Sequence, residues 1–484
     1  MRNTVENAVG RDGGHWRTAA SLATLVLLVA LSAGQVRADD PAPAAKKSIE
    51  GYWLGTLKPG AIEMRLGFRI RKNGDGTLTA TGDSIDQGTK DLPVETVTFA
   101  DDTLTLKMPD MKAVYTGKLQ PDGDTIKGEL EKGAKMPLDL KRQDKPLALN
   151  RPQLPKKPYP YAEEEVTFPS KAKGVTLAGT FTKPKGNGRF AVAVLITGSG
   201  PQDRDESVMG HKPFLVLADY LTRQGIAVLR YDDRGIAKST GDYQTATSRD
   251  FADDTAGAVA YLIARKDVGK IGLIGHSEGG MIAPMVAVEC SDVSFIVLLA
   301  GPGTPGDAIV VAQAQLIVKA MGGDEKAMAR QKSLHQKLFA VVRAEDEAKT
   351  KVAMADLEKG LSDAEKAGVR AQVSLVASPW YKYFLSYDPR PMLGKVRCPV
   401  LALNGEKDLQ VPATENLAEI EKAVRAGGNA DVTVRELPGL NHLFQPTKTG
   451  LPTEYGNIKT TFAPAVLEMI ADWIAKRTGS GEKP

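Results

Sequence analysis

Residues 271–280, with the sequence IGLIGHSEGG, constrain the fold more than any other part of the chain. An apolar run ends at Gly275 and a helix-forming run follows from Met281, so the pattern predicts a strand, a tight turn and a helix with Ser277 at the apex. Such a turn needs very small residues two positions before and after the serine, and Gly275 and Gly279 occupy those positions. We therefore predict a nucleophile elbow; the alternative is a glycine-rich turn with an inert serine.

Strand and helix patterns alternate on both sides of the elbow, through residues 162–478. This alternation predicts a mostly parallel sheet with helices on both of its faces. The alternation is interrupted at about residues 302–396, which are rich in Ala, Lys, Glu, Met and Gln and form several amphipathic patterns. We expect this segment to be a helical cap, inserted between two core strands where it can cover Ser277.

The preceding part of the chain has a different pattern. Short runs with period-two alternation recur through residues 48–141, separated by Asn, Asp and Gly turns, which is typical of a small antiparallel β-barrel or sandwich. The expected role of this domain is packing or substrate presentation. Residues 142–161 contain five prolines and several lysines and are expected to form a stiff linker.

The N-terminus resembles a targeting segment. Several arginines precede an apolar run at residues 19–33, and Val36 and Ala38 supply the small residues that a cut after Ala38 requires. Residues 1–38 are therefore expected to be a secretory signal peptide; the alternative is a signal anchor that is not cut. The mature protein would be periplasmic or secreted, with no stable membrane insertion.

Charge and cysteine content exclude some classes of function. The net charge of +4 is small and no Lys/Arg block stands out, so nucleic acid is not an expected partner. Export would allow a disulfide between Cys290 and Cys398, but two independent buried thiols are the favoured prediction. No spacing of His, Cys and Asp fits a metal site, and no cofactor is expected.

A serine becomes a nucleophile when a histidine takes its proton, and the histidine is oriented by a carboxylate. In this architecture the order along the chain is serine, acid, histidine. Two histidines follow Ser277. His442 lies in a loop after the last core strand, where the base belongs, whereas His335 lies in the helical insertion and is expected at the surface.

The acid should lie on the loop after the preceding core strand, which carries Glu406 and Asp408. We predict Asp408 as the acid, with Glu406 in reserve; an ordinary turn carboxylate is the alternative for each. Stabilisation of the oxyanion needs two backbone N–H groups. We predict the amides of Glu278 and Ser199, with Gly200 as the reserve for Ser199.

Other polar residues fall near the same end of the predicted sheet. His276 adjoins the serine and is expected to pack beneath the sheet edge, and His211 could line the site. An ion-pair network that stiffens two loops is the expected role of Asp203, Arg204, Asp232, Asp233 and Arg234.

Five motifs occur in a fixed order: GSGPQDRD (198–205), YDDRG (231–235), GHSEGG (275–280), GEKD (405–408) and LNHLF (440–444). Together they resemble a group of bacterial α/β-hydrolases that is similar to EstD-type carboxylesterases and to the serine aminopeptidase-like branch. The resemblance implies the α/β-hydrolase fold with a helical cap, and proteins of this group also tend to carry a β-rich N-terminal domain.

Residues and resemblance together predict an exported serine hydrolase. Its substrate would be a small carboxylic ester, with a short acyl chain, cleaved through an acyl-enzyme at Ser277. An aminopeptidase, thioesterase or acyl transferase using the same three residues remains open, because this branch includes all of these activities. A further alternative is a non-catalytic envelope-binding protein that works through its β domain.

Overall fold

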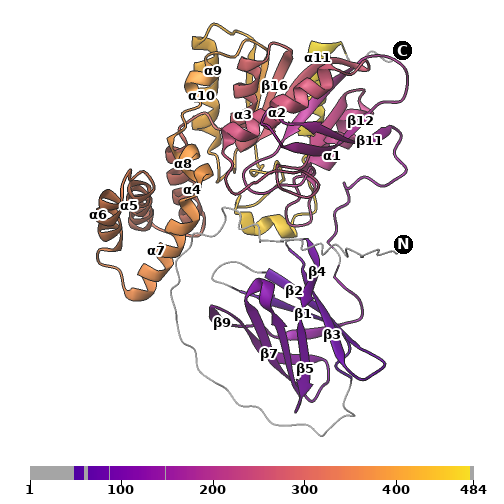
Figure 1. Ribbon diagram of the computed structural model, residues 1–484, viewed down its shortest axis with the longest axis vertical. Coiled ribbons are helices and arrows are strands. Elements are labelled where there is room, and N and C mark those ends of the chain that lie inside the picture. Colours follow the sequence, from indigo (N-terminus) through magenta and orange to yellow (C-terminus); the bar gives the residue numbers. More distant parts are fainter. Residues whose placement is uncertain (1–47, 59–63, 87, 148, 480–484) are drawn as a thin grey trace, which may run out of the picture.

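The computed structural model describes residues 48–58, 64–86, 88–147 and 149–479; the predicted signal peptide lies outside them. It contains an α/β domain, a separate β domain below it and a helical extension to one side (Figure 1). The predicted fold class, an α/β-hydrolase domain preceded by a small β domain, is confirmed by this arrangement.

The β domain is one antiparallel sheet that curls into a nearly closed barrel. Its path order is β4-β3-β2-β1-β10-β8-β7-β6-β5, and β9 pairs with β8. The first and last strands of this order are joined by the single residue Glu95, so the two edges of the sheet meet. The elements are β1 Gly51–Leu57, β2 Met64–Lys72, β3 Leu78–Ser84, β4 Thr89–Val94, β5 Thr96–Ala100, β6 Thr103–Met108, η1 Pro109–Met111, β7 Ala113–Leu119, β8 Thr125–Lys132, β9 Ala134–Pro137 and β10 Leu140–Gln143.

Alternation along these strands produces the core of the barrel. Trp53, Leu106, Tyr115 and Ile126 point inward and are fully buried. Residues between them on the same strands are mostly partly or fully exposed. This is the period-two pattern expected of a sheet with one face on the core and one face in water.

The α/β domain is built on an eight-stranded sheet with the order β11-β12-β14-β13-β15-β16-β17-β18. β11 and β12 form an antiparallel hairpin, β12 is antiparallel to β14, and the remaining pairs are parallel. The strands are β11 Ala162–Pro169, β12 Thr176–Lys183, β13 Phe190–Ile196, β14 Ala227–Tyr231, β15 Val268–His276, β16 Val293–Leu299, β17 Val400–Gly405 and β18 Val432–Leu437.

Helices cover both faces because the central strands are apolar on both sides. On β13, Val192 and Val194 belong to one core cluster, together with α2, α3 and α10, while Ala193 and Leu195 belong to the opposite cluster, with α1 and α11. The helices are α1 Pro213–Arg223, α2 Ser248–Ile263, α3 Glu278–Glu289, α10 Ala413–Ala426, α11 Pro464–Thr478 and the 3-10 turn η2 Pro452–Asn457.

The insertion between β16 and β17 is helical, as the sequence pattern predicts. Its helices are α4 Gly306–Ala320, α5 Glu325–Val342, α6 Glu347–Glu358, α7 Asp363–Val376, α8 Pro379–Ser386 and α9 Arg390–Leu393. α4 and α8 lie beside the α/β domain, and α5, α6 and α7 project away from it (Figure 1).

The prediction that His335 lies at the surface is wrong. It is 3% exposed, inside the cap, where its ring meets Phe339 edge-on at 6.0 Å. The Nδ1 atom faces the carbonyl oxygen of Gln331, one turn earlier, at 2.9 Å. An amphipathic helix places one side of each turn in the interior, and His335 shares that side with Leu338 and Val342, which are also buried.

The linker residue Arg151 binds the α/β domain close to where the two domains meet. Its guanidinium donates to the carbonyl oxygens of Met209 at 2.7 Å, Gly456 at 2.9 Å and Ile458 at 3.0 Å. Beside it, a methyl group placed on Gly456 would lie 3.0 Å from the carboxylate of Asp86 in the β domain. The β domain is therefore packed directly against the α/β domain.

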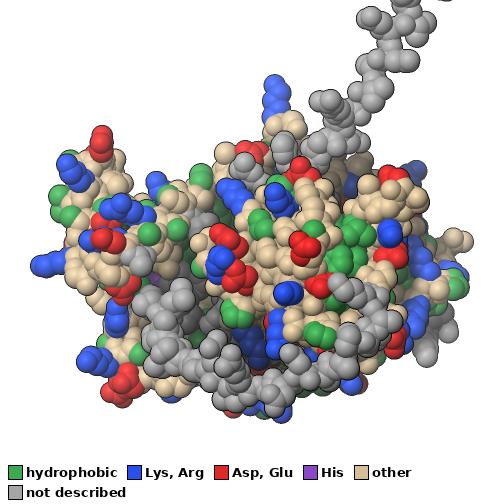
Figure 2. Space-filling model, turned by 90° about the horizontal axis from the view of Figure 1, so that it is seen from below, with side chains coloured by type: hydrophobic (Ala, Val, Ile, Leu, Met, Phe, Trp, Pro, Cys, Tyr) green, Lys and Arg blue, Asp and Glu red, His purple; other side chains and the backbone are tan. Residues whose placement is uncertain are grey.

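The surface seen from below carries acidic and basic side chains interspersed, with apolar side chains in small groups (Figure 2). Among the described residues, none of the helices is both long enough and apolar enough to span a bilayer.

Candidate active site

The elbow has the backbone strain that its sequence predicts. Ser277 stands between β15 and α3 with φ 51° and ψ −115°, in a region that L-residues rarely occupy. A methyl group on Gly275 would lie 2.0 Å from the carbonyl oxygen of Gly279, and one on Gly279 would lie 2.2 Å from that of Ile196. Both positions therefore require glycine. Ser277 itself is partly exposed to solvent.

His442 and Asp408 lie together on neighbouring loops. His442 Nδ1 is 2.7 Å from Asp408 Oδ2, and both residues are nearly fully buried. Since the carboxylate can only accept, Nδ1 carries the proton and Nε2 is left to accept one. Asp408 follows β17 and His442 follows β18, adjacent parallel strands whose carboxyl ends meet at one edge of the sheet.

The Asp408 carboxylate is fixed by its own loop. Its Oδ1 atom accepts from the backbone nitrogens of Gln410 at 2.7 Å and Val411 at 2.9 Å, so its Oδ2 atom faces the histidine. Glu406, the reserve candidate, instead accepts from the backbone nitrogen of Gly439 at 2.8 Å. The structure therefore brings Asp408, and not Glu406, to His442.

The loop after β13 reaches the elbow. A methyl group on Gly198 would lie 3.3 Å from the Cβ atom of Ser277, so Ser199 and Gly200, the predicted oxyanion segment, begin next to the nucleophile. Asp233 holds both ends of this loop: it accepts from the Thr197 hydroxyl at 2.7 Å and from the Gln202 backbone nitrogen at 2.9 Å. Burial raises the pKa of the Asp233 carboxyl well above its usual range.

A buried pair, Glu206 and His276, lies next to the elbow. His276 Nδ1 is 2.8 Å from Glu206 Oε1, and Nε2 is 3.0 Å from the carbonyl oxygen of His442. The same Glu206 oxygen accepts from the Gly198 backbone nitrogen at 2.7 Å. Burial alone would lower the pKa of His276, but the charge and hydrogen bond of Glu206 outweigh it and the net direction is upward. The pair therefore connects the elbow, the Gly198 loop and the His442 loop.

The side chain of Glu278 is also buried, and it connects the core to the cap. Its Oε1 atom accepts from Ser248 Oγ at 2.6 Å and from Trp380 Nε1 at 2.7 Å. Burial raises the pKa of Glu278 to about 7, while these hydrogen bonds oppose that rise.

Sequence reasoning missed Glu206, Trp380 and the roles of two further side chains, those of Asp233 and Glu278. Glu206 directly follows the GSGPQDRD motif, and this position next to a motif was a usable signal. Trp380 belongs to the aromatic run PWYKYFLSY, which stands out in an otherwise aromatic-poor insertion. The sequence places Asp233 in an ion-pair network, but its carboxylate accepts from a hydroxyl and from a backbone amide instead.

His211 lies in the interior and does not line the site. Its two ring nitrogens are 2.9 Å from Thr461 Oγ1 and 3.0 Å from the carbonyl oxygen of Tyr455, and burial lowers its pKa to about 4. Elsewhere in the expected network, Arg204 pairs with Asp232 at 2.7 Å. Arg234 pairs instead with Asp254 at 2.7 Å, and Asp203 accepts from the Ser207 hydroxyl at 2.8 Å.

Both cysteines are free, and each is partly buried. Burial raises the pKa of Cys398 to about 11. Within the described ranges, no group of three His, Cys, Asp or Glu side chains is placed to hold a metal ion.

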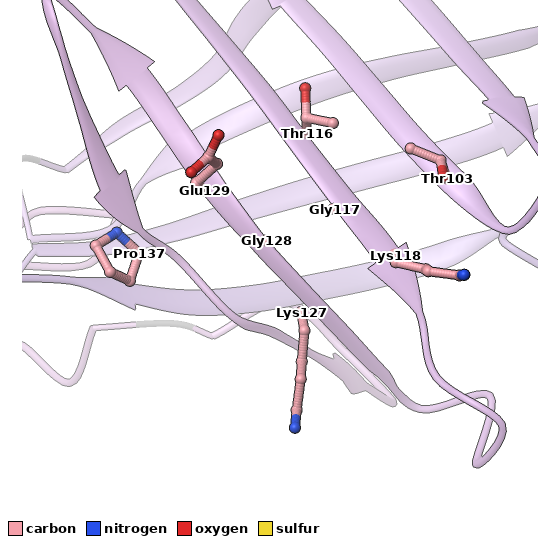
Figure 3. Close-up of a pocket in the computed structure, with 8 residues that line it drawn as sticks. All are labelled: Thr103, Thr116, Gly117, Lys118, Lys127, Gly128, Glu129 and Pro137. Atoms are coloured by element: carbon pink, nitrogen blue, oxygen red, sulfur yellow. The ribbon is translucent and has the colours of Figure 1, made fainter. Parts of the chain in front are cut away.

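Two hollows are relevant to ligand binding. A cavity of about 10 Å³, room for a single water, lies behind the elbow between residues that include Gly198, Asp233 and Glu278. A shallower hollow of about 380 Å³ lies on the outside of the β domain (Figure 3). It is lined by side chains such as Lys118 and Lys127, which point away from the strands, and it is not part of the elbow.

Known proteins with a similar sequence and known proteins with a similar structure are both found for this chain. A profile described as serine aminopeptidase, S33, matches residues 212–359, which include the elbow but not Asp408 or His442. The chain is 29% identical over 304 residues to "Esterase EstD" of Thermotoga maritima. That alignment covers 62% of this chain and 66% of the relative, so the chain spans just under two thirds of the relative's length.

Solved structures also resemble the chain. The Pyrococcus furiosus esterase Pf2001 matches 68% of this chain and 99% of its own, with 14% identity and a TM-score of 0.41. A proline iminopeptidase from Mycobacterium smegmatis matches 66% of this chain and 100% of its own, with 16% identity and a TM-score of 0.41.

Proposed function

We propose that this chain is a serine carboxylesterase of the α/β-hydrolase type, acting through Ser277, His442 and Asp408. The observation that carries the proposal is the 2.7 Å contact between His442 Nδ1 and Asp408 Oδ2 on loops at the same sheet edge as the strained Ser277. It leaves the His442 Nε2 atom as the free basic nitrogen.

In the proposed reaction, Ser277 Oγ attacks the ester carbonyl carbon while His442 Nε2 takes the hydroxyl proton. The backbone amides of Ser199 and Glu278 stabilise the oxyanion, and each such donor typically contributes about 10²–10³ in turnover. His442 returns the proton to the leaving alkoxide and the alcohol departs. Water then attacks the acyl-enzyme by the same route and releases the carboxylic acid.

A short acyl chain is proposed because Trp380 of the cap lies within hydrogen-bond distance of Glu278, the residue after the nucleophile. The indole therefore lies beside the elbow, and we propose that it limits the length of the acyl chain there. The relative named "Esterase EstD" supports an ester substrate in general and does not bear on chain length.

An aminopeptidase is the second candidate, since the matching profile is described as serine aminopeptidase. Binding the free amine of a peptide would need an accessible carboxylate. Near the elbow, Glu206, Asp233 and Glu278 are all buried and all accept hydrogen bonds from protein groups. This favours the esterase over the peptidase.

The test is the hydrolysis of p-nitrophenyl acetate, butyrate and decanoate, and of leucine p-nitroanilide, by the mature chain and by Ser277→Ala. We expect turnover that favours the two short esters and is lost in the variant. Turnover of the anilide alone would support the peptidase. No turnover of any substrate, with no labelling of Ser277 by a fluorophosphonate, would refute both.

We further propose that the protein is exported. The support is the arginine-rich start followed by the apolar run at residues 19–33 and small residues at Val36 and Ala38. Sequencing the N-terminus of the protein from a periplasmic or medium fraction should give Asp39 as the first residue. A protein that retains residues 1–38 would contradict cleavage.

A further inference from the structure

The Glu278 side chain forms a bridge between core and cap at the nucleophile. One carboxylate oxygen accepts from Ser248 Oγ, at the start of α2, and from Trp380 Nε1, on cap helix α8. Glu278 is 3% exposed and Ser248 is fully buried. The Ser248 half of the bridge is therefore out of bulk water and the Trp380 half is partly shielded from it, so both hydrogen bonds are electrostatically stronger than they would be at the surface.

On the cap side, the indole moves together with its helix. Trp380 stacks on Phe384 with ring centres 5.3 Å apart and planes 12° apart, and it meets Tyr381 edge-on at 5.7 Å. The Ser378 hydroxyl caps α8 by accepting from the Tyr381 backbone nitrogen. Because the indole is packed against its own helix, a displacement of α8 displaces the Nε1 donor as well.

Burial of this carboxylate is unfavourable, because the two side chains that donate hydrogen bonds to it, Ser248 and Trp380, are both uncharged. The Glu278 carboxylate shares the small cavity with Asp233 and Asp254. Arg234 balances the charge of Asp254 at 2.7 Å. Burying a carboxylate next to another acid is unfavourable unless hydrogen bonds compensate. The two donors supply that compensation, and one of them comes from the cap.

We infer that Glu278 is a positioning residue through which cap helix α8 holds the oxyanion amide in place. The inference rests on the proposed function, in which the backbone N–H of Glu278 binds the oxyanion. Side chain and amide share one Cα atom, so loss of the Trp380 hydrogen bond frees the first residue of α3 to shift. An acyl group that pushes α8 away would accordingly lower kcat more than it raises KM.

The test measures kcat and KM for p-nitrophenyl acetate in Trp380→Phe, Glu278→Ala and Glu278→Gln. We expect kcat to fall about 10-fold in the first two, with KM changing less than about threefold, since the amide is displaced but not removed. Glu278→Gln should stay within about threefold of wild type, because its amide oxygen accepts from both donors.

Trp473→Phe is the matched control. It removes an indole N–H from α11, outside the elbow and the cap, and should leave both kinetic constants unchanged. A wild-type kcat in Trp380→Phe, or a Glu278→Gln variant as impaired as Glu278→Ala, would overturn the inference while leaving the esterase intact. Failure of the wild-type chain to turn over any ester would instead refute the proposed function, and the inference with it.

An independent readout is the emission of Trp380, obtained as the difference between wild type and Trp380→Phe. Glu278→Ala should shift this component to longer wavelength, because its indole N–H loses a buried acceptor and meets water. Glu278→Gln should not. An unchanged Trp380 component in Glu278→Ala would show that the bridge does not hold the cap in solution, and would also overturn the inference.

Discussion

At the scale of single residues, the candidate site is organised by buried carboxylates. Asp408 faces His442, Glu206 faces His276, Asp233 ties the two ends of the loop after β13, and Glu278 reaches the cap. Each is buried and accepts hydrogen bonds from protein donors, as buried charge requires. Removing one partner from such an arrangement costs more than the contact itself contributes, since the other partner stays desolvated.

Glu206→Gln should destabilise the protein and impair catalysis. His276 would lose the carboxylate that raises its pKa, at a cost of about 3 kcal/mol in the free energy of unfolding near pH 6. A histidine whose folded pKa is raised contributes stability below its unfolded pKa, near 6.5, and loses it as pH rises through the folded pKa. The difference between wild type and variant should therefore be largest below about pH 6.5 and shrink at alkaline pH.

Urea unfolding from pH 5 to pH 9 measures this difference. Glu415→Gln, an exposed carboxylate on α10, is the control and should change little at any pH. A Glu206→Gln variant as stable as wild type at pH 6 would show that the Glu206–His276 pair does not carry the charge we assign to it.

Glu278→Gln should become progressively more stable than wild type as pH rises. Burial raises the folded pKa of Glu278 to about 7, above its unfolded value near 4.5, so the folded state binds more protons in that window and wild-type stability falls as pH rises through it. Glutamine removes the titration. The free energy of unfolding of Glu278→Gln should then exceed that of wild type by about 3 kcal/mol above pH 7. A gap that stays constant between pH 5 and pH 8 in the same urea series would contradict the assigned pKa.

At the scale of elements, the elbow depends on close backbone contact between β13, β15 and α3. Gly279→Ala should place a methyl group 2.2 Å from the carbonyl oxygen of Ile196 and force α3 away from the sheet. We expect kcat on p-nitrophenyl acetate to fall by at least about 100-fold, because the predicted oxyanion amide of Glu278 moves with the helix. Gly368→Ala in cap helix α7 has open space around it and should instead stabilise by about 0.5–1 kcal/mol. Wild-type kcat in Gly279→Ala would contradict the geometry of the elbow.

Local pattern was enough to predict most elements of the fold. The alternation in β6 and β7 and the continuous apolar runs of β13, β15 and β16 are strong signals, and the elbow glycines have a steric reason that is visible in sequence. The chain order of serine, acid and histidine also led to the Asp408–His442 pair, which the structure brings together; its catalytic role stays a prediction.

Other features could not be predicted, because they arise from contacts between distant segments. His276 was expected only to pack, and its partner Glu206 is 70 residues away; Trp380 is 102 residues from Glu278. The burial of His335 depends on how the cap helices pack on one another, which its amphipathic pattern leaves undetermined.

At the scale of the whole molecule, Arg151 holds the linker between the two domains against the α/β domain, next to the contact between Gly456 and Asp86 of the β domain. Arg151→Ala would remove the donor from one buried and two partly buried carbonyl groups, and we expect a loss of about 2 kcal/mol in stability together with loosening of the linker. Limited proteolysis should then cut within residues 142–161, and small-angle scattering should show a larger radius of gyration. Lys156→Ala, at an exposed linker position, should behave as wild type. Equal protease resistance in Arg151→Ala would mean that other contacts hold the domains.

The central claim is that Ser277 and His442 act as one catalytic unit, and kcat/KM in a double-mutant cycle tests it most directly. We would measure p-nitrophenyl acetate hydrolysis by Ser277→Ala, His442→Ala and the double variant. Residues that act as a unit are strongly non-additive. We therefore predict that each single variant loses nearly all the activity and that the double variant is no worse than either. A His442→Ala variant that keeps substantial turnover, or losses that multiply in the double variant, would contradict the account.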